Sequence, residues 1–323
     1  IEFGNIHSNP LFGAGDLYLN GELIENLVIP DGVKTIPDYA FYDLPHIKSL
    51  TIPNSVVSIG NSAFYGCSGI SEKLHISNSV TEIGNNAFYN CFGIESLSLG
   101  ESLETIGAYA FHNCYNLSNS LIIPNKIRRI ELGAFDGCSG LTDLTLGESI
   151  EAIEDNAFSG CSSLTGSLNI PNSVNYIGRR AFNDCKELRN VTIGESVSSI
   201  GSEVFANCEN IVSVNIPASL NYIGHNAFIN CNRLKDLYIN DLKSYCDIEW
   251  EVIGNHGMEF SSPLDYASNL YLNEELIEDS VIPDDVTKIS DKLFYDLDHI
   301  KSISIPNSVT SIGSNAFQAC EGV

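Results

Sequence analysis

The sequence predicts an α/β solenoid built mainly from short parallel strands, and three observations support this. A marker phenylalanine, preceded by Ala, Val or Leu in most coils, returns along nearly the whole chain of 323 residues. The residues between successive markers repeat one pattern of apolar, turn and polar positions. No segment has the length or the 3.6-residue periodicity of a long amphipathic helix. The markers are Phe41, Phe64, Phe88, Phe111, Phe135, Phe158, Phe182, Phe205, Phe228, Phe294 and Phe317.

The spacing of the marker phenylalanines indicates which class of solenoid the chain forms. Successive markers are 23 or 24 residues apart, except for one gap of 66 residues between Phe228 and Phe294. A period near 23 lies within the range of roughly 20–29 residues of leucine-rich repeats and is too short for ankyrin, tetratricopeptide or propeller units. We therefore expect a single curved, right-handed leucine-rich repeat solenoid over residues 1–323, with each marker side chain buried.

One coil illustrates each predicted element in order. Alternate apolar residues over 47–52 predict a short strand whose side chains enter a core on one face. The Pro-Asn-Ser sequence at 53–55 is typical of a turn, and residues 56–59 predict a second short extended piece. Asn61 is a candidate cap for a brief helical or 3₁₀ turn over residues 62–67, which holds the marker and a cysteine.

The sequence also repeats with two periods that are longer than a single coil. Turns that end in Gly-Glu-Ser contain Glu101, Glu148 and Glu195, which are 47 residues apart. They alternate with turns that end in Pro-Asn-Ser, which indicates that the repeat unit was duplicated as a pair. Residues 17–70 also realign with 270–323 at a constant offset of 253. We expect the parent chain to be an array of such blocks, with any targeting signal or anchor outside these residues.

These periods predict the organisation of the chain. Residues 17–24 read as a tight hairpin around Asn20-Gly21. The second copy has Asn273-Glu274 at that turn, which weakens the same prediction there. The predicted segments are an irregular cap-like segment at 1–24, regular repeats at 25–239, an irregular interrupting segment at 240–280 and the start of the next block at 281–323.

The interrupting segment is rich in aromatic residues. It contains Tyr245, Trp250, Phe260 and Tyr266. One interpretation is an internal cap, in which these side chains fill a break between blocks. The other is a ligand-binding island, because irregular loops on rigid scaffolds often carry function.

The repeat pattern L-x-I-P-x-S-V-x-x-I-G-x-x-A-F-x-x-C-x-x-L resembles that of BspA-like bacterial surface proteins, which are also found in treponemes and trichomonads. The resemblance is strong over about 41–231 and 294–323. It implies a secreted or cell-surface protein, because members of this class are displayed there and several bind host matrix proteins or other cells. Others are passive repeats attached to enzymes or cell-wall modules.

Composition and motifs argue against several functions. A net charge of −25 disfavours binding to nucleic acid and electrostatic docking on anionic lipid, and no apolar run predicts membrane insertion in this part of the protein. The sequence lacks a nucleophile elbow, a phosphate-binding glycine loop and a metalloprotease motif, so we expect no enzyme, no catalytic residue and no cofactor. Neither the histidines nor the carboxylates form a metal motif, although the acidic surface leaves calcium open.

The cysteines follow the repeat. Nine of the ten lie three residues after a marker phenylalanine, and Leu44 and Leu297 occupy the same position in other coils. A position that accepts leucine or cysteine calls for a modest apolar side chain. We therefore expect a ladder of reduced, buried thiols, with Cys246 as a packed thiol outside it.

The remaining candidate for function is the outward side of the first strand of each coil, which is the concave face of a leucine-rich repeat solenoid. Most side chains there are small and polar, and Tyr238 stands out as a residue type favoured at interfaces. We expect a protein partner, for which a host protein is one candidate, on this face or on the irregular segment. The alternative is a passive spacer or accessory region of a larger surface protein or enzyme. The candidate binding residues are Asn190, Thr192, Ser213, Asn215, Asp236, Tyr238 and Trp250.

Overall fold

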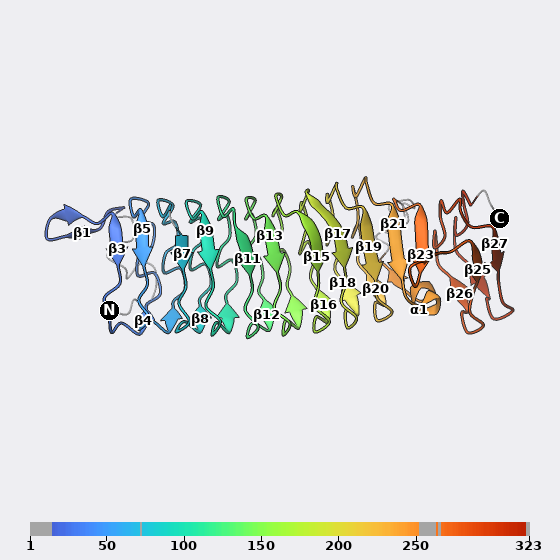
Figure 1. Cartoon of the computed structure of the whole chain (residues 1–323), viewed down its shortest axis with the longest axis horizontal. Coiled ribbons are helices and arrows are strands. Elements are labelled where there is room, and N and C mark those ends of the chain that lie inside the picture. The colour runs from blue at the N-terminus through green and yellow to red at the C-terminus, as the bar shows by residue number, and fades with distance from the viewer. Residues whose placement is uncertain (1–14, 72, 252–262, 264–265, 321–323) are drawn as a thin grey trace. The chain divides into compact units, whose positions relative to one another are not determined.

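A computed structural model of the chain describes residues 15–71, 73–251, 263 and 266–320 (Figure 1). The residues form two compact units, one ending at Thr165 and the other beginning at Gly166. Each unit is a parallel β-solenoid with almost no helix, which confirms the repeat architecture. The predictions of curvature, of handedness and of one continuous array remain predictions.

Each regular coil contributes two strands, which we call the first-row and the second-row strand. In the first unit, first-row strands pair in parallel with the core leucines in register, as Leu27 pairs with Leu50 and Leu74 with Leu97. The first-row strands are β3 (Asn26–Val28), β5 (Ser49–Thr51), β7 (Lys73–His75), β9 (Ser96–Ser98), β11 (Ser120–Ile122) and β13 (Asp143–Thr145). The second-row strands are β4 (Thr35–Ile36), β6 (Ser58–Ile59), β8 (Glu82–Ile83), β10 (Thr105–Ile106), β12 (Arg129–Ile130) and β14 (Ala152–Ile153).

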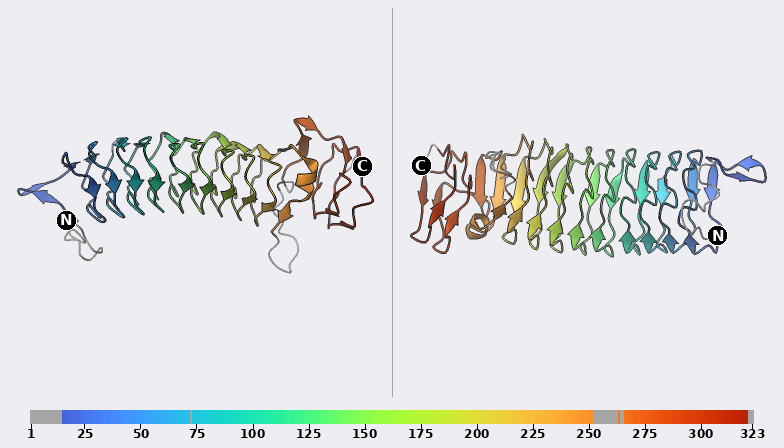
Figure 2. Two further views of the ribbon diagram at one scale, coloured as in Figure 1. Left: turned by 90° about the horizontal axis from the view of Figure 1, so that it is seen from below. Right: turned by 180° about the vertical axis from the view of Figure 1, so that it is seen from behind.

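The second unit repeats this arrangement, with first-row strands of three to five residues. Figure 2 shows the strands of neighbouring coils side by side within each unit. The first-row strands are β15 (Gly166–Asn169), β17 (Leu188–Thr192), β19 (Ser213–Ile216), β21 (Asp236–Ile239), β23 (Asn269–Leu272), β25 (Asp279–Val281) and β27 (Ser302–Ser304). The second-row strands are β16 (Tyr176–Ile177), β18 (Ser199–Ile200), β20 (Tyr222–Ile223), β22 (Glu249–Trp250), β26 (Lys288–Ile289) and β28 (Ser311–Ile312).

The segment that holds the marker phenylalanine differs from the helical or 3₁₀ turn expected there. Asn86 and Asn90 both have positive φ, at 56° and 57°, which is incompatible with a continuous right-handed helix. The N–H of Phe88 donates to Ala110 O of the next coil at 2.8 Å, whereas that of Tyr89 donates to Asn86 O at 3.1 Å. Alternate N–H groups thus leave the coil, so the segment joins neighbouring coils as a further hydrogen-bonded ladder.

The core is a stack of the marker phenylalanines. Phe135 is fully buried, and its ring lies parallel to those of Phe111 and Phe158 at centroid distances of 5.4 Å each. Burial of the markers is confirmed for the inner coils, whereas Phe41 and Phe317 are only partly buried. Each ring packs against the ring of the neighbouring coil. Within each unit this stacking fixes the register of one coil on the next.

Close stacking also explains the glycine that follows some first-row strands. A Cβ atom on Gly194 would lie 2.3 Å from Pro171 O, and one on Gly147 would lie 2.8 Å from Pro124 O. Neither carbonyl is a flexible group that could move aside cheaply. Glycine at 147 and at 194 therefore avoids a clash with the proline carbonyl of the preceding coil.

Both predicted hairpins form. The strands β1 (Tyr18–Leu19) and β2 (Glu22–Leu23) are antiparallel, and so are β23 and β24 (Glu275–Leu276). The doubt raised by Glu274 was misplaced, because Asn273 and Glu274 adopt φ values of 52° and 68°, in the left-handed region, as the turn requires.

The irregular segment contains the one α-helix among the described residues, α1 (Leu242–Cys246). The Asp241 side chain caps it by accepting from Ser244 N at 2.7 Å. Tyr245 is fully buried, and its hydroxyl donates to Leu293 O at 3.4 Å, as expected of an internal cap. Phe260 lies outside the described residues.

Candidate functional site

The thiol ladder has a polar partner that the sequence did not reveal. Cys91 Sγ donates to Phe64 O at 3.0 Å, and Cys138 Sγ donates to Phe111 O at 3.2 Å. The acceptor in each case is the carbonyl of the marker in the preceding coil. The cysteine position therefore combines an apolar body with a weak donor, which explains why cysteine is more frequent there than leucine.

Burial keeps these thiols protonated. Desolvation raises the pKa of Cys67 and of Cys138 to about 12, and it raises the pKa of Cys91 well above its ordinary value. Cys246 in α1 is also buried, and its pKa is raised to about 12 for the same reason. Because the thiolate is the reactive form, these groups are protected from oxidation at neutral pH.

We predict that nearly all ten cysteines are reduced in the native protein. A disulfide-sensitive reagent added after denaturation without reductant should count nearly ten thiols, and the same reagent should react slowly before denaturation. The reason is that eight of the nine ladder cysteines are buried, and sulfurs such as those of Cys91 and Cys138 donate a hydrogen bond that an oxidised sulfur cannot donate. A count of two or fewer would refute this reading and indicate a cross-linked solenoid.

Six of the seven predicted binding residues lie together on the first-row strands β17, β19 and β21 of the second unit. Their polar groups satisfy one another along one line of the sheet. Asn190 Nδ2 donates to Ser167 Oγ at 3.2 Å, and Ser213 Oγ donates to Asn190 Oδ1 at 2.8 Å. Asp236 Oδ1 accepts from Asn269 Nδ2 at 2.7 Å. This line is a self-satisfied polar surface.

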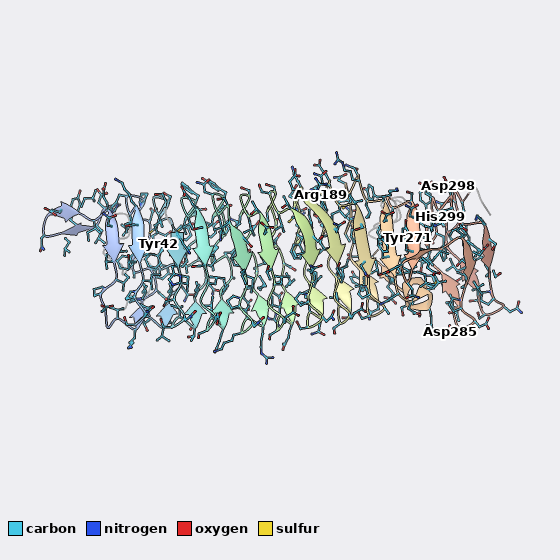
Figure 3. The ribbon with its side chains drawn as sticks, viewed as in Figure 1. Tyr42, Arg189, Tyr271, Asp285, Asp298 and His299 are labelled. Carbon is cyan, nitrogen blue, oxygen red and sulfur yellow. The ribbon has the colours of Figure 1, made fainter. Side chains whose placement is uncertain are left out.

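The neighbouring line of the same face ends in two stacked tyrosines. The parallel register places Thr192 beside Asn215, Asn215 beside Tyr238 and Tyr238 beside Tyr271. The rings of Tyr238 and Tyr271 are stacked with centroids 4.6 Å apart and planes 17° apart. We call these two residues the tyrosine pair, and Figure 3 labels Tyr271 on β23.

A groove of about 720 Å³ opens beside the tyrosine pair. Glu195, Asn240 and Glu274 also line it. The amide of Asn240 donates to both oxygens of the Glu195 carboxylate, at 3.3 and 3.2 Å, and so holds that side chain in place. The groove therefore joins two aromatic rings on paired strands with amide and carboxylate groups from the adjoining turns.

The tyrosine hydroxyl groups remain protonated at neutral pH. Partial burial, followed by the nearby Asp236 carboxylate, raises the pKa of Tyr238 and of Tyr271 above the ordinary value. Each phenol can therefore both donate and accept a hydrogen bond.

Trp250 does not join this group. It lies on β22, a second-row strand, where it pairs with Ile223 of β20. Sequence reasoning also missed Tyr271, because the residues around it were read as the start of a hairpin and not as a strand beside β21. The signal was present in the alternation of Asn269 and Tyr271 around Leu270, which matches that of Asp236 and Tyr238 around Leu237.

The described residues contain neither a metal-ligand cluster nor a membrane-spanning helix. Among residues 15–71, 73–251, 263 and 266–320, no three His, Cys, Asp or Glu side chains are grouped so that they could bind a metal ion. Within the same residues no helix has both the length and the apolar character needed to cross a bilayer.

Comparison with known proteins agrees with the repeat pattern. A family model described as the BspA type leucine rich repeat region matches residues 16–142, 104–235 and 265–323, in 6 copies. A search of curated proteins finds no match.

Three solved structures illustrate the similarity of fold. A leucine-rich repeat protein from Bacteroides ovatus is 24% identical, with a TM-score of 0.59, covering 92% of this chain and 85% of that one. A leucine rich cell surface protein from Faecalibacterium prausnitzii is 26% identical, with a TM-score of 0.41 and coverages of 92% and 77%. The leucine rich repeat protein of T. pallidum is 20% identical, with a TM-score of 0.33 and coverages of 78% and 83%. The Bacteroides protein superposes well enough to support the same fold, and the other two superpose more loosely.

Proposed function

Because the chain belongs to the BspA-type leucine-rich repeat family, we propose that it is a non-catalytic interaction array, secreted or displayed on a cell surface. Its binding site is the first-row strand face of the second unit, and its ligand is a protein. The observation that carries this proposal is the tyrosine pair beside the groove, because tyrosines on a rigid surface are typical of binding hot spots.

The arrangement favours recognition over catalysis. Tyr238 and Tyr271 are fixed by paired strands, so binding costs little conformational entropy. The groove offers hydrogen-bonding groups but no nucleophile paired with a general base. The raised pKa values of the phenols keep them neutral donors at physiological pH.

We expect the purified chain to bind saturably to at least one immobilised extracellular matrix protein in a surface plasmon resonance panel. The double variant Tyr238→Ser/Tyr271→Ser should weaken that binding about a thousandfold, because interface tyrosines each contribute on the order of 2 kcal/mol and every 1.4 kcal/mol or so is a factor of ten in affinity. Serine is compatible with the backbone, since Ser98 and Ser304 occupy the corresponding position of other first-row strands.

The matched control removes another stacked pair of tyrosines, in the first unit. Tyr42 and Tyr65 form another stacked pair, with centroids 4.8 Å apart, in the marker segments of the first unit (Tyr42 is labelled in Figure 3). Tyr42→Ser/Tyr65→Ser should leave the affinity unchanged. Equal losses in both double variants would contradict a site at the tyrosine pair.

A passive spacer is the second candidate, and one observation favours it. The side chains of Ser167, Asn190 and Ser213 already satisfy one another, so that part of the face offers few free groups to a partner. The absence of saturable binding to every member of the panel would support the spacer and would overturn the interaction array.

A further inference from the structure

The groove beside the tyrosine pair is built to receive a positive charge. Two carboxylates, those of Glu195 and Glu274, line it, and none of its described lining residues is a lysine or an arginine. A third carboxylate, that of Asp236, lies on the same face of β21 as Tyr238, two residues before it. The chain as a whole carries a net charge of −25, which adds long-range attraction for a cation.

The geometry of the rings limits how a ligand can approach. Tyr238 and Tyr271 each give one face to the other ring. Asn215 is the strand neighbour on the far side of Tyr238, and Leu276 is the neighbour on the far side of Tyr271. A ligand therefore meets ring edges and hydroxyl groups more than open ring faces, which disfavours a sugar stacked flat on a platform.

Glu274 gives a second indication. It occupies the hairpin turn with φ of 68°, whereas the corresponding residue of the first hairpin is Gly21. A non-glycine residue in the left-handed region is unfavourable for folding. The second hairpin therefore keeps a carboxylate at the edge of the groove at the expense of backbone strain.

We infer that the groove binds an arginine side chain of the partner protein. A guanidinium group has a fixed fork of N–H donors that matches carboxylate oxygens, and its weakly hydrated plane tolerates contact with aromatic rings. Glu195, already held by Asn240, and Glu274 accept from the guanidinium, and the phenol oxygens accept at its edge. This inference rests on the proposed function and names the chemistry of its ligand.

The test uses a short fluorescein-labelled peptide that carries several arginines separated by glycine and serine, with fluorescence anisotropy as the readout. A matched peptide replaces each arginine by citrulline, which keeps the shape but removes the charge. We expect the arginine peptide to bind saturably and the citrulline peptide to bind at least about tenfold more weakly, with the difference shrinking as salt increases.

Variants of the chain locate the site. Glu195→Gln and Glu274→Gly should each weaken the arginine peptide about fivefold or more. Glu274→Gly should also raise the melting temperature, because it relieves the left-handed strain, so its loss of binding cannot be attributed to unfolding. Glu148→Gln is the matched control, because Glu148 occupies the same turn position as Glu195, with its N–H held by Asn125 as that of Glu195 is held by Asn172.

Three outcomes would overturn the inference. One is equal binding of the citrulline peptide, and another is an equal loss in Glu148→Gln, which would indicate unspecific charge attraction. The third is salt-insensitive binding of a neutral oligosaccharide such as maltohexaose that is lost in Tyr238→Ser/Tyr271→Ser. If the matrix-protein panel still depends on the tyrosine pair in any of these cases, the proposed function stands and only the arginine assignment fails.

Discussion

Raising the pH from 8 to 10 under reducing conditions is expected to destabilise the solenoid strongly. A thiol in the unfolded chain loses its proton near pH 8.5, whereas burial raises the pKa of Cys67 and Cys138 to about 12 in the folded chain. Between these values the folded state binds more protons than the unfolded state, so stability falls as the pH rises. Between these two pKa values, each such thiol lowers the free energy of unfolding by about 1.4 kcal/mol per pH unit.

The effect is large because the same burial recurs in coil after coil. Cys91, Cys114, Cys161 and Cys208 also have a pKa raised by desolvation. At pH 10 each buried thiol has lowered the free energy of unfolding by about 2 kcal/mol. Several such losses together approach the roughly 5–15 kcal/mol that stabilises an ordinary domain. Urea unfolding followed by circular dichroism at pH 8, 9 and 10 measures the loss.

A double variant isolates the contribution of the thiols. Cys138→Ala/Cys161→Ala removes two titrating groups from neighbouring coils, and it should be less stable than the parent at pH 7 because it loses packing. Its free energy of unfolding should nevertheless fall less steeply with pH. Its slope should be smaller than that of the parent by about 2.8 kcal/mol per pH unit. An unchanged slope would assign the alkaline unfolding to tyrosine or lysine titration and not to the ladder.

The sequence predicted the strands accurately, for a physical reason. Every first-row strand except β25, which is centred on Ser280, is centred on a leucine, valine or isoleucine, and the strand predicted within residues 47–52 is β5 (Ser49–Thr51). Period-two alternation specifies a strand because one face must be buried. A repeat that recurs in every coil strengthens this signal beyond what one short strand could give.

The marker segment could not be predicted in the same way. Its N–H groups alternate between partners in the same coil and in the next coil, and only the stacked structure supplies the second set. Asn90, Gly137 and Asp184, all with positive φ, did carry a local hint, because such residues favour the left-handed conformation. The other left-handed position of each coil accepts residues such as Arg180 and Glu203, so the neighbouring coils and not the residue type impose its conformation.

The candidate site was predicted in part. Tyr238 was found because it interrupts a run of small polar residues, but its partner Tyr271 lies on β23, after the long irregular stretch of residues 240–268. Pairing between β21 and β23 joins residues across that segment, and no spacing rule for regular coils specifies the register. Trp250 was assigned by residue type alone, and its place on a second-row strand separates it from the tyrosine pair.

The largest effect of a single substitution is expected for Phe135→Ala. The ring is fully buried and lies between those of Phe111 and Phe158, so its removal leaves a cavity that the flanking rings cannot close without losing their own stacking. Truncation of a buried phenylalanine costs about 3–5 kcal/mol. The variant should therefore show faster hydrogen exchange around this coil.

The loss should remain local, because a solenoid coil contacts mainly its neighbours. The N–H of Phe135 donates to Ala157 O at 2.9 Å and that of Phe111 donates to Ala134 O at 2.8 Å, so these amides should lose protection first. Phe41→Ala is the matched control, because Phe41 is partly exposed and stacks on Phe64, so it should cost clearly less. If exchange near Phe135 stayed unchanged in Phe135→Ala, or if both variants lost the same stability, the phenylalanine stack would not be the element that holds the coils together.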